Sequence, residues 1–131
     1  MGLTMTDFFD TMREKYPKMY DESYDLYVGP GWHKLIEELS HLIQSRINWS
    51  IKTSNPIPQV KVQQVKEKFG GLRFYYDGGD DKIDGMVEMA EAIAEVTCEE
   101  CGKPGHSRSG GWIKVLCDEH EAVRQEKMKG D

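Results

Sequence analysis

The chain has 131 residues and a mass of 15.1 kDa, with 38% hydrophobic residues, 31% charged residues and a formal net charge of −6. This length fits one domain, and the apolar residues suffice for a modest core, which excludes disorder along the whole chain. The negative charge argues against a protein that coats nucleic acid by bulk electrostatics, and the short apolar runs exclude a membrane span.

The first half of the chain predicts two helices. TDFFDTMREKYP has amphipathic spacing and is ended by Pro17. The residues of the tyrosine-rich segment 16–28 do not indicate a role for it. GPG, residues 29–31, is a turn, and WHKLIEELSHLIQSRINW then has the strongest helical periodicity of the chain. Its apolar stripe consists of Trp32, Leu35, Ile36, Leu39, Leu42, Ile43 and Ile47. His33 and His41 lie off this stripe or at its edge, and we expect both to be exposed.

The second half predicts a β-hairpin and a further helix. Two runs alternate apolar and polar residues on either side of KEKFGG: Val60 and Val62, then Leu72, Phe74 and Tyr76. Val65 and Phe69 do not continue one period, so we expect a β-bulge in the register. DKIDGMVEMAEAIAEVT has helical spacing and runs almost directly into the first cysteine.

This order of elements predicts an α+β fold, with two or three helices packed on one face of a small antiparallel β-hairpin or sheet. We expect residues 1–97 to form the α+β core. Residues 98–131 are expected to form a zinc-ribbon-like knuckle and a C-terminal tail, packed on the core as one domain.

All three cysteines fall within CEECGKPGHSRSGGWIKVLCDEH. Cys98 and Cys101 are two residues apart and precede a glycine, as in a zinc knuckle, and Cys117 and His120 repeat the same gap. The pattern C-x2-C-x15-C-x2-H supplies three sulfurs and one nitrogen, a complete tetrahedral set for one structural Zn²⁺ ion. His106, in the loop between the pairs, is an alternative fourth ligand, although the symmetry of the two half-sites favours His120.

Four protein ligands leave no open position for water or substrate, so we expect the zinc to hold structure and the chain not to be an enzyme. An iron–sulfur cluster is disfavoured because such clusters usually take four cysteines. No nucleophile elbow, phosphate-binding loop, dinucleotide fingerprint or HExxH motif is present, and we expect no small-molecule substrate. A zinc-dressed nuclease of the HNH kind is a lesser alternative, because the chain lacks histidines at the start of a hairpin and on a following helix.

The charges are unevenly distributed along the chain. Between residues 52 and 76 there are five basic residues and one acidic residue, whereas residues 77–95 hold seven acidic residues and one basic residue. Either segment could present a polar face to a partner or simply face solvent. The candidate partner-binding residues are Lys61, Lys66, Lys68, Arg73, Tyr75 and Arg108.

Four segments between residues 29 and 120 carry a resemblance to known proteins: GPGWHKLIEELSHLI, QQVKEKFGGLRFYYDGGDDKIDGMVEMAEA, CEECGKPG and GGWIKVLCDEH. They resemble a recurring family of small, mostly uncharacterised proteins encoded by bacteriophages and prophages. The resemblance implies a phage or mobile-element origin and zinc binding through Cys98, Cys101, Cys117 and His120, and it brings no established activity.

The start MGLTMTDFFDTMREKYP has no basic residues followed by an apolar stretch, so we expect no secretory signal. Together with the odd number of cysteines, this favours a reducing cytoplasm, that of the host cell if a phage encodes the chain.

Two functions compete. The first is an accessory protein that binds a host protein, for example an inhibitor of a host enzyme or defence system, with the carboxylates of residues 77–95 able to mimic nucleic-acid charge. The second is a nucleic-acid-binding zinc-ribbon module, in which the basic hairpin binds phosphates and Tyr75, beside Arg73, stacks on a base. The net acidity favours the first, and the residues do not indicate an oligomeric state.

Overall fold

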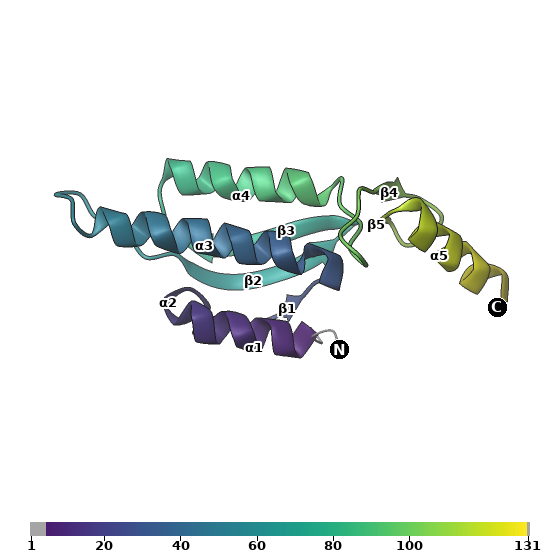
Figure 1. Ribbon diagram of the computed structural model, residues 1–131, viewed down its shortest axis with the longest axis horizontal. Helices are drawn as coiled ribbons and strands as arrows, with labels where there is room; N and C mark the ends of the chain where they lie inside the picture. The colour runs from purple at the N-terminus through teal and green to yellow at the C-terminus, as the bar shows by residue number, and fades with distance from the viewer. Residues whose placement is uncertain (1–4, 131) are drawn as a thin grey trace.

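The computed structural model describes residues 5–130, and for residues 5–7 and 130 only the backbone. It confirms the predicted α+β class, with helices packed on a small sheet and a cysteine cluster near the C-terminus (Figure 1). The elements in chain order are α1 (Met5–Lys15), α2 (Pro17–Tyr20), β1 (Leu26–Tyr27), the 3₁₀ helix η1 (Pro30–Trp32), α3 (His33–Ser50), β2 (Lys61–Lys68), β3 (Gly71–Asp77), α4 (Asp81–Ala94), β4 (His106–Arg108), β5 (Lys114–Leu116) and α5 (Asp118–Gly130). Within the described residues, no helix is both long and apolar enough to cross a membrane.

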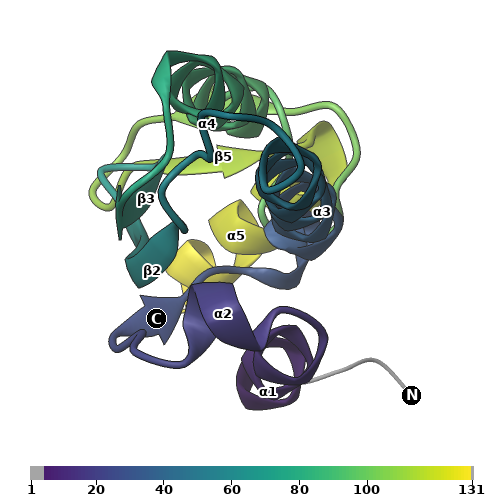
Figure 2. The same cartoon turned by 90° about the vertical axis from the view of Figure 1, so that its left-hand side faces the viewer.

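The main sheet has three strands in the order β1-β2-β3, with β2 and β3 antiparallel and β1 parallel to β2. Viewed along the long axis, α1, α3 and α4 all lie on one side of this sheet (Figure 2). No element of the described residues covers the other face of the sheet (Figure 2). The short β1, which places Tyr27 beside Lys66, was not predicted.

The β2–β3 hairpin turns on two residues only, Phe69 and Gly70, whose φ angles are 54° and 80°. Two positive φ angles are typical of the turns that match strand twist, and they explain why a glycine stands at the second position. The strands therefore extend further toward the turn than the six-residue spacer KEKFGG suggests. The register shifts between Val62 and Gln64, which confirms the predicted bulge.

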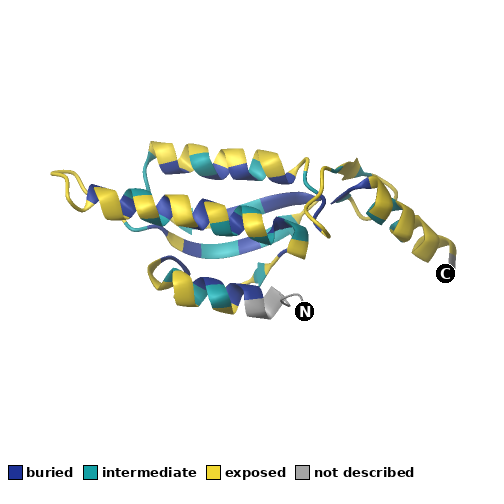
Figure 3. Cartoon of the chain, viewed as in Figure 1, coloured by how far each residue is buried: buried dark blue, intermediate teal, exposed yellow. Residues whose placement is uncertain are grey.

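That bulge keeps the core continuous. Because it inserts one extra residue, Val62 and Val65 are both buried although they are three positions apart. The residues that form the core with them come from every layer: Phe8, Phe9, Met12, Met19, Tyr20, Val28, Trp32, Ile36, Leu39, Ile43, Ile47, Val60, Leu72, Phe74, Ile83, Val87, Ala90, Ala94 and Val115. Figure 3 shows that the buried residues of the helices lie along the sides that meet the sheet and one another.

Two expectations about α3 are wrong. Leu42 is 51% exposed, because it lies with Met89 and Ile93 in an apolar groove between α3 and α4 rather than in the core. His33 is half-buried, and its ring stacks on Phe8 with 4.0 Å between centroids and 5° between planes. Burial lowers the pKa of His33, while a hydrogen bond to the backbone of Val28 opposes that shift. His41 is exposed, as predicted.

The C-terminal part of the chain lies beyond one end of the sheet. A small antiparallel hairpin, β4–β5, leads into α5, which extends away from the rest of the molecule (Figure 1). The sequence did not predict α5 as a helix. Its first turn carries Asp118, Glu119 and Glu121 and its last turn Lys127 and Lys129, the arrangement that a helix dipole favours. Its described side chains are all exposed or half-buried.

Candidate metal centre

Three cysteines and one histidine converge between β5, α5 and the loop after α4. The candidate ligand atoms of Cys98, Cys101, Cys117 and His120 all lie within 4.8 Å of one another. The Sγ atoms of Cys101 and Cys117 are 3.8 Å apart, and Nδ1 of His120 lies 3.7 Å from Sγ of Cys98 and 3.2 Å from that of Cys117. A tetrahedral ion with bonds of about 2.3 Å to sulfur and about 2.1 Å to nitrogen has ligand–ligand edges of roughly 3.6–3.8 Å. The group could therefore hold a metal ion.

Local backbone structure positions each half of this group. The amide of Cys98 donates to the carbonyl of Lys103, and the amide of Gly102 donates to the carbonyl of Cys98, both at 2.8 Å. Gly102 has a φ of 84°, so this tight turn needs a residue that tolerates the left-handed region. The first turn of α5 then places His120 three residues after Cys117, on the same side of the helix start.

His120, rather than His106, is the histidine that lies with the cysteines. His106 is exposed on β4, where it pairs with Leu116, and it is not part of the convergent group.

The electrostatics of the group favour the thiolate at Cys117. The backbone amide of His120, and after it the His120 side chain and the other two thiols, lower the pKa of Cys117 to about 6. At Cys101 the backbone of Lys103 lowers the pKa, but burial and the other two thiols outweigh it and raise the pKa. A thiolate is the form of cysteine that binds metal ions. Cys98 and Cys117 are buried, whereas Cys101 is exposed, so the group lies at the edge of the C-terminal part.

This metal knuckle, residues 98–102, is joined to the core through η1. The amide of Gly31 donates to the carbonyl of Glu99 at 2.7 Å, and Nε1 of Trp32 donates to the carbonyl of Thr97 at 2.9 Å. A Cβ atom at Gly31 would lie only 2.0 Å from the carbonyl oxygen of Cys98. The glycines of GPG therefore do more than allow a turn, because the absence of a side chain lets the backbone of η1 contact the backbone of the metal knuckle.

The predicted partner-binding residues fall into two places. Strand register puts Lys61, Lys66, Lys68, Arg73 and Tyr75 on the open face of the sheet, with Lys66 directly opposite Arg73. Arg108 is elsewhere, and its guanidinium contacts the Leu116 carbonyl at 3.2 Å and the Asp118 carboxylate at 2.8 Å. Its side chain is only 16% exposed, so it serves the C-terminal part itself.

The acidic residues of the α4 region are largely used within the fold. Asp80 caps α4 by accepting from the amide of Ile83 at 3.0 Å, and Arg46 binds the same carboxylate at 2.8 Å. Glu91 accepts from the amide of Phe74 at 3.1 Å, which satisfies part of the edge strand β3. Because these carboxylates are already bonded within the fold, α4 is less suited to bind a basic partner through its acidic residues.

Sequence reasoning missed a set of residues at the junction between the hairpin tip and the metal knuckle. Trp112 and Ile113 precede β5, and Trp112 is 70% exposed. Glu99 is buried at 6% exposure, and its Oε1 atom has no hydrogen-bond partner among the described residues. Burial, and next the negative charge of Glu67, raise the pKa of Glu99 to about 7. The segment CEEC gave no signal that would separate Glu99 from its exposed neighbour Glu100.

Comparison of the chain with models of protein families, with curated proteins and with solved structures found no match.

Proposed function

We propose that the Cys₃His group binds one zinc ion and that this ion is structural. Three thiolates and one imidazole are ligands that zinc prefers, and four protein ligands leave no position for water or substrate. Because the knuckle bonds to Gly31, and Thr97 just before it bonds to Trp32, the bound ion would also stabilise the junction with the core. No step of catalysis is assigned to it.

Paired histidine variants test this ligand set. Four ligands share a binding free energy of about 10–16 kcal/mol, so His120→Ala should weaken zinc binding roughly 100-fold or more. His106→Ala should leave the affinity unchanged, because His106 is exposed outside the group. Competition with a zinc-sensitive dye and native mass spectrometry measure affinity and stoichiometry. A His120→Ala protein that keeps one tightly bound zinc would disprove the assignment.

We propose further that the chain is a non-enzymatic binding protein and that the open face of the sheet is its interaction surface. The observation that carries this proposal is the row of side chains on that face, where Tyr27 lies next to Lys66, and Lys66 opposite Arg73. Tyr75 adds a second exposed ring, 5.9 Å from the Lys66 ammonium. Tyrosine and arginine are the residues that most often anchor protein interfaces.

A protein partner suits this face better than nucleic acid. Lys61 is paired with Glu22 at 3.5 Å and Lys66 with Asp25 at 3.4 Å, so two of the four basic residues are already partly neutralised. The net charge of −6 also repels a polyanion at long range. Together with the resemblance to phage-encoded proteins, this supports a host protein as the partner, for example an enzyme or a defence complex.

Single-stranded nucleic acid is the second candidate for the same face. The alternation of Lys66, Arg73 and Tyr75 on an open sheet is the arrangement on which bases stack while cations bind phosphates. This alternative predicts binding to short single strands that falls steeply as salt is raised.

A pull-down from bacterial lysate separates the two candidates. We expect the zinc-loaded protein to capture one stoichiometric protein, and the double variant Lys66→Glu, Arg73→Glu to lose it. The matched control Lys34→Glu, Lys82→Glu makes the same charge change at exposed positions on α3 and α4 and should still bind. Salt-sensitive retention of single-stranded DNA, abolished by the first double variant alone, would instead establish the nucleic-acid function.

A further inference from the structure

Two cavities meet where the hairpin tip faces the metal knuckle. One has a volume of about 410 Å³ and lies between Phe69, Glu67 and Trp112, and the other, of about 330 Å³, lies between Tyr27, Glu99 and Trp112. Glu67 and Trp112 line both, so the two cavities adjoin. We call this region the junction site.

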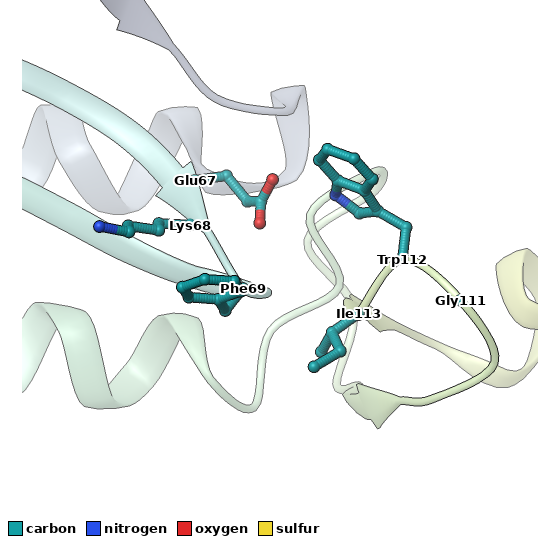
Figure 4. A pocket seen from close by; sticks show the side chains of 6 residues that line it. All are labelled: Glu67, Lys68, Phe69, Gly111, Trp112 and Ile113. Atoms are coloured by element: carbon teal, nitrogen blue, oxygen red, sulfur yellow. The ribbon is translucent and has the colours of Figure 1, made fainter.

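Aromatic rings form the walls of the junction site. Phe69 is 74% exposed, Trp112 70% and Tyr27 62%, although apolar rings of this size normally find cover in a folded protein. Figure 4 shows the indole of Trp112 across the gap from Phe69, with the carboxylate of Glu67 directed toward the gap. The ammonium of Lys68 points away from it. Exposed rings grouped around a hollow are a feature of binding sites.

Carboxylates form the floor. Glu99 lines the site and is 6% exposed, yet within residues 5–130 its buried Oε1 atom has no hydrogen-bond partner. Glu67 uses one oxygen to accept from the amide of Gly70 at 2.7 Å. Lys114 also lines the site, but among the described residues no hydrogen bond or ion pair joins it to Glu99. A buried carboxylate oxygen without a donor is costly, so a donor that enters here gains more than it would at the surface.

We propose that the junction site binds a guanidinium group, presented as an arginine side chain of the partner protein. A planar guanidinium can pair with a carboxylate through two parallel hydrogen bonds while it stacks on an aromatic ring. The site offers both requirements, with Glu67 and Glu99 as acceptors and Trp112 and Phe69 as stacking surfaces. An anionic ligand would be repelled by the carboxylates, and a purely apolar one would leave Glu99 without a donor. This inference rests on the proposed protein-binding function for the origin of the arginine. The junction site shares Tyr27 with the open face of the sheet, but its acceptors, Glu67 and Glu99, are not on that face.

The test uses the full-length, zinc-loaded protein and small probes. N-acetyl-arginine methylamide is titrated while the indole ¹H–¹⁵N resonance of Trp112 is followed by NMR. We expect a saturable shift with a dissociation constant in the millimolar range, as befits one side chain. N-acetyl-citrulline methylamide has nearly the same shape without the charge and should give no saturable shift.

Variants locate the binding. Glu99→Gln should weaken the arginine probe about tenfold, because it removes a charge-assisted acceptor. Glu88→Gln is the matched control, an exposed position on α4. Trp112→Leu changes an exposed side chain, is expected to fold, and should also weaken binding, with the backbone amide of Gly111 as the reporter. Circular dichroism and zinc stoichiometry establish that each variant is folded.

The outcomes separate this inference from the proposed function. Saturable binding of the arginine probe that is lost in Glu99→Gln and Trp112→Leu supports the junction site, whatever the pull-down gives. Equal binding of the citrulline probe, or no saturable shift at tens of millimolar probe, overturns it even if the sheet face captures a protein. If free arginine binds clearly more tightly than N-acetyl-arginine methylamide, its free amino or carboxylate group contributes to binding. That result would contradict an arginine side chain of a protein as the natural ligand.

Discussion

Replacing Gly31 with alanine adds one methyl group at the contact between η1 and the metal knuckle. The new Cβ would lie 2.0 Å from the carbonyl oxygen of Cys98 and 2.6 Å from the amide nitrogen of Gly102, whereas ordinary contact begins at 3.4 Å. Both are backbone atoms, so the two segments must separate by roughly 1 Å to relieve the overlap. The separation would also strain the hydrogen bonds from Gly31 to Glu99 and from Trp32 to Thr97.

The expected cost of Gly31→Ala is about 3–5 kcal/mol. Overpacking of this kind costs about 1–3 kcal/mol, and each weakened hydrogen bond adds about 1 kcal/mol. Because the overlap falls on Cys98 and Gly102, the affinity for zinc should fall as well. Urea unfolding followed by circular dichroism, at a fixed free zinc concentration, measures the loss. With a slope of roughly 1.5 kcal/mol per molar urea, the midpoint should fall by about 2–3 M.

Gly85→Ala is the control for this experiment. It makes the same chemical change in α4, where a new Cβ would meet nothing within 4 Å. Alanine is a better helix former than glycine, so this variant should be more stable than the parent by up to about 1 kcal/mol. If Gly31→Ala unfolds at the same urea concentration as the parent, the close backbone contact between η1 and the knuckle does not exist in solution, and the reasoning fails.

Two further predictions concern the core and the start of α4. Ser40→Ala should cost about 1–3 kcal/mol in thermal or urea unfolding, because it leaves the buried Tyr20 hydroxyl, now 2.7 Å from Ser40, without a partner. Tyr20→Phe should cost less, since Ser40 keeps its bond to the carbonyl of Ile36, and the opposite order would contradict this account. Hydrogen bonding from Arg46, and then from the amide of Ile83, lowers the pKa of Asp80. The Asp80 carboxylate therefore stabilises the fold fully above about pH 4, the pKa of an aspartate in the unfolded chain. This stabilisation is lost as the pH falls through the pKa of Asp80 in the folded protein. Asp80→Asn keeps the helix cap but removes the charge, so its free energy of unfolding should be about 0.5–1 kcal/mol below that of the parent near neutral pH. This difference should vanish in acid. A difference that stays constant from pH 7 to pH 2 would contradict the role of the charge.

Patterns local in the sequence predicted the secondary structure that carries the fold. Spacings of three and four residues mark α3 and α4, because a helix places such residues on one face. Alternation of apolar and polar residues marks β2 and β3. The break in that alternation at Val65 correctly indicated a bulge. The two-residue gaps of CEEC and CDEH indicated the four side chains that converge, since such gaps bring two ligands within reach of one ion.

The tertiary structure decided everything that depends on which distant surfaces meet. His33 is half-buried because Phe8 of α1 lies against its ring, and no pattern around His33 indicates that contact. Gly31 must be glycine because the backbone of Cys98 approaches it from 67 positions along the chain. The junction site combines side chains from β1, the hairpin tip, the knuckle and the segment that leads into β5, four segments that give no sign of a site when taken one at a time. Periodicity reports the side of an element that a residue occupies, whereas burial, pKa and cavities depend on the neighbours that only long-range packing supplies.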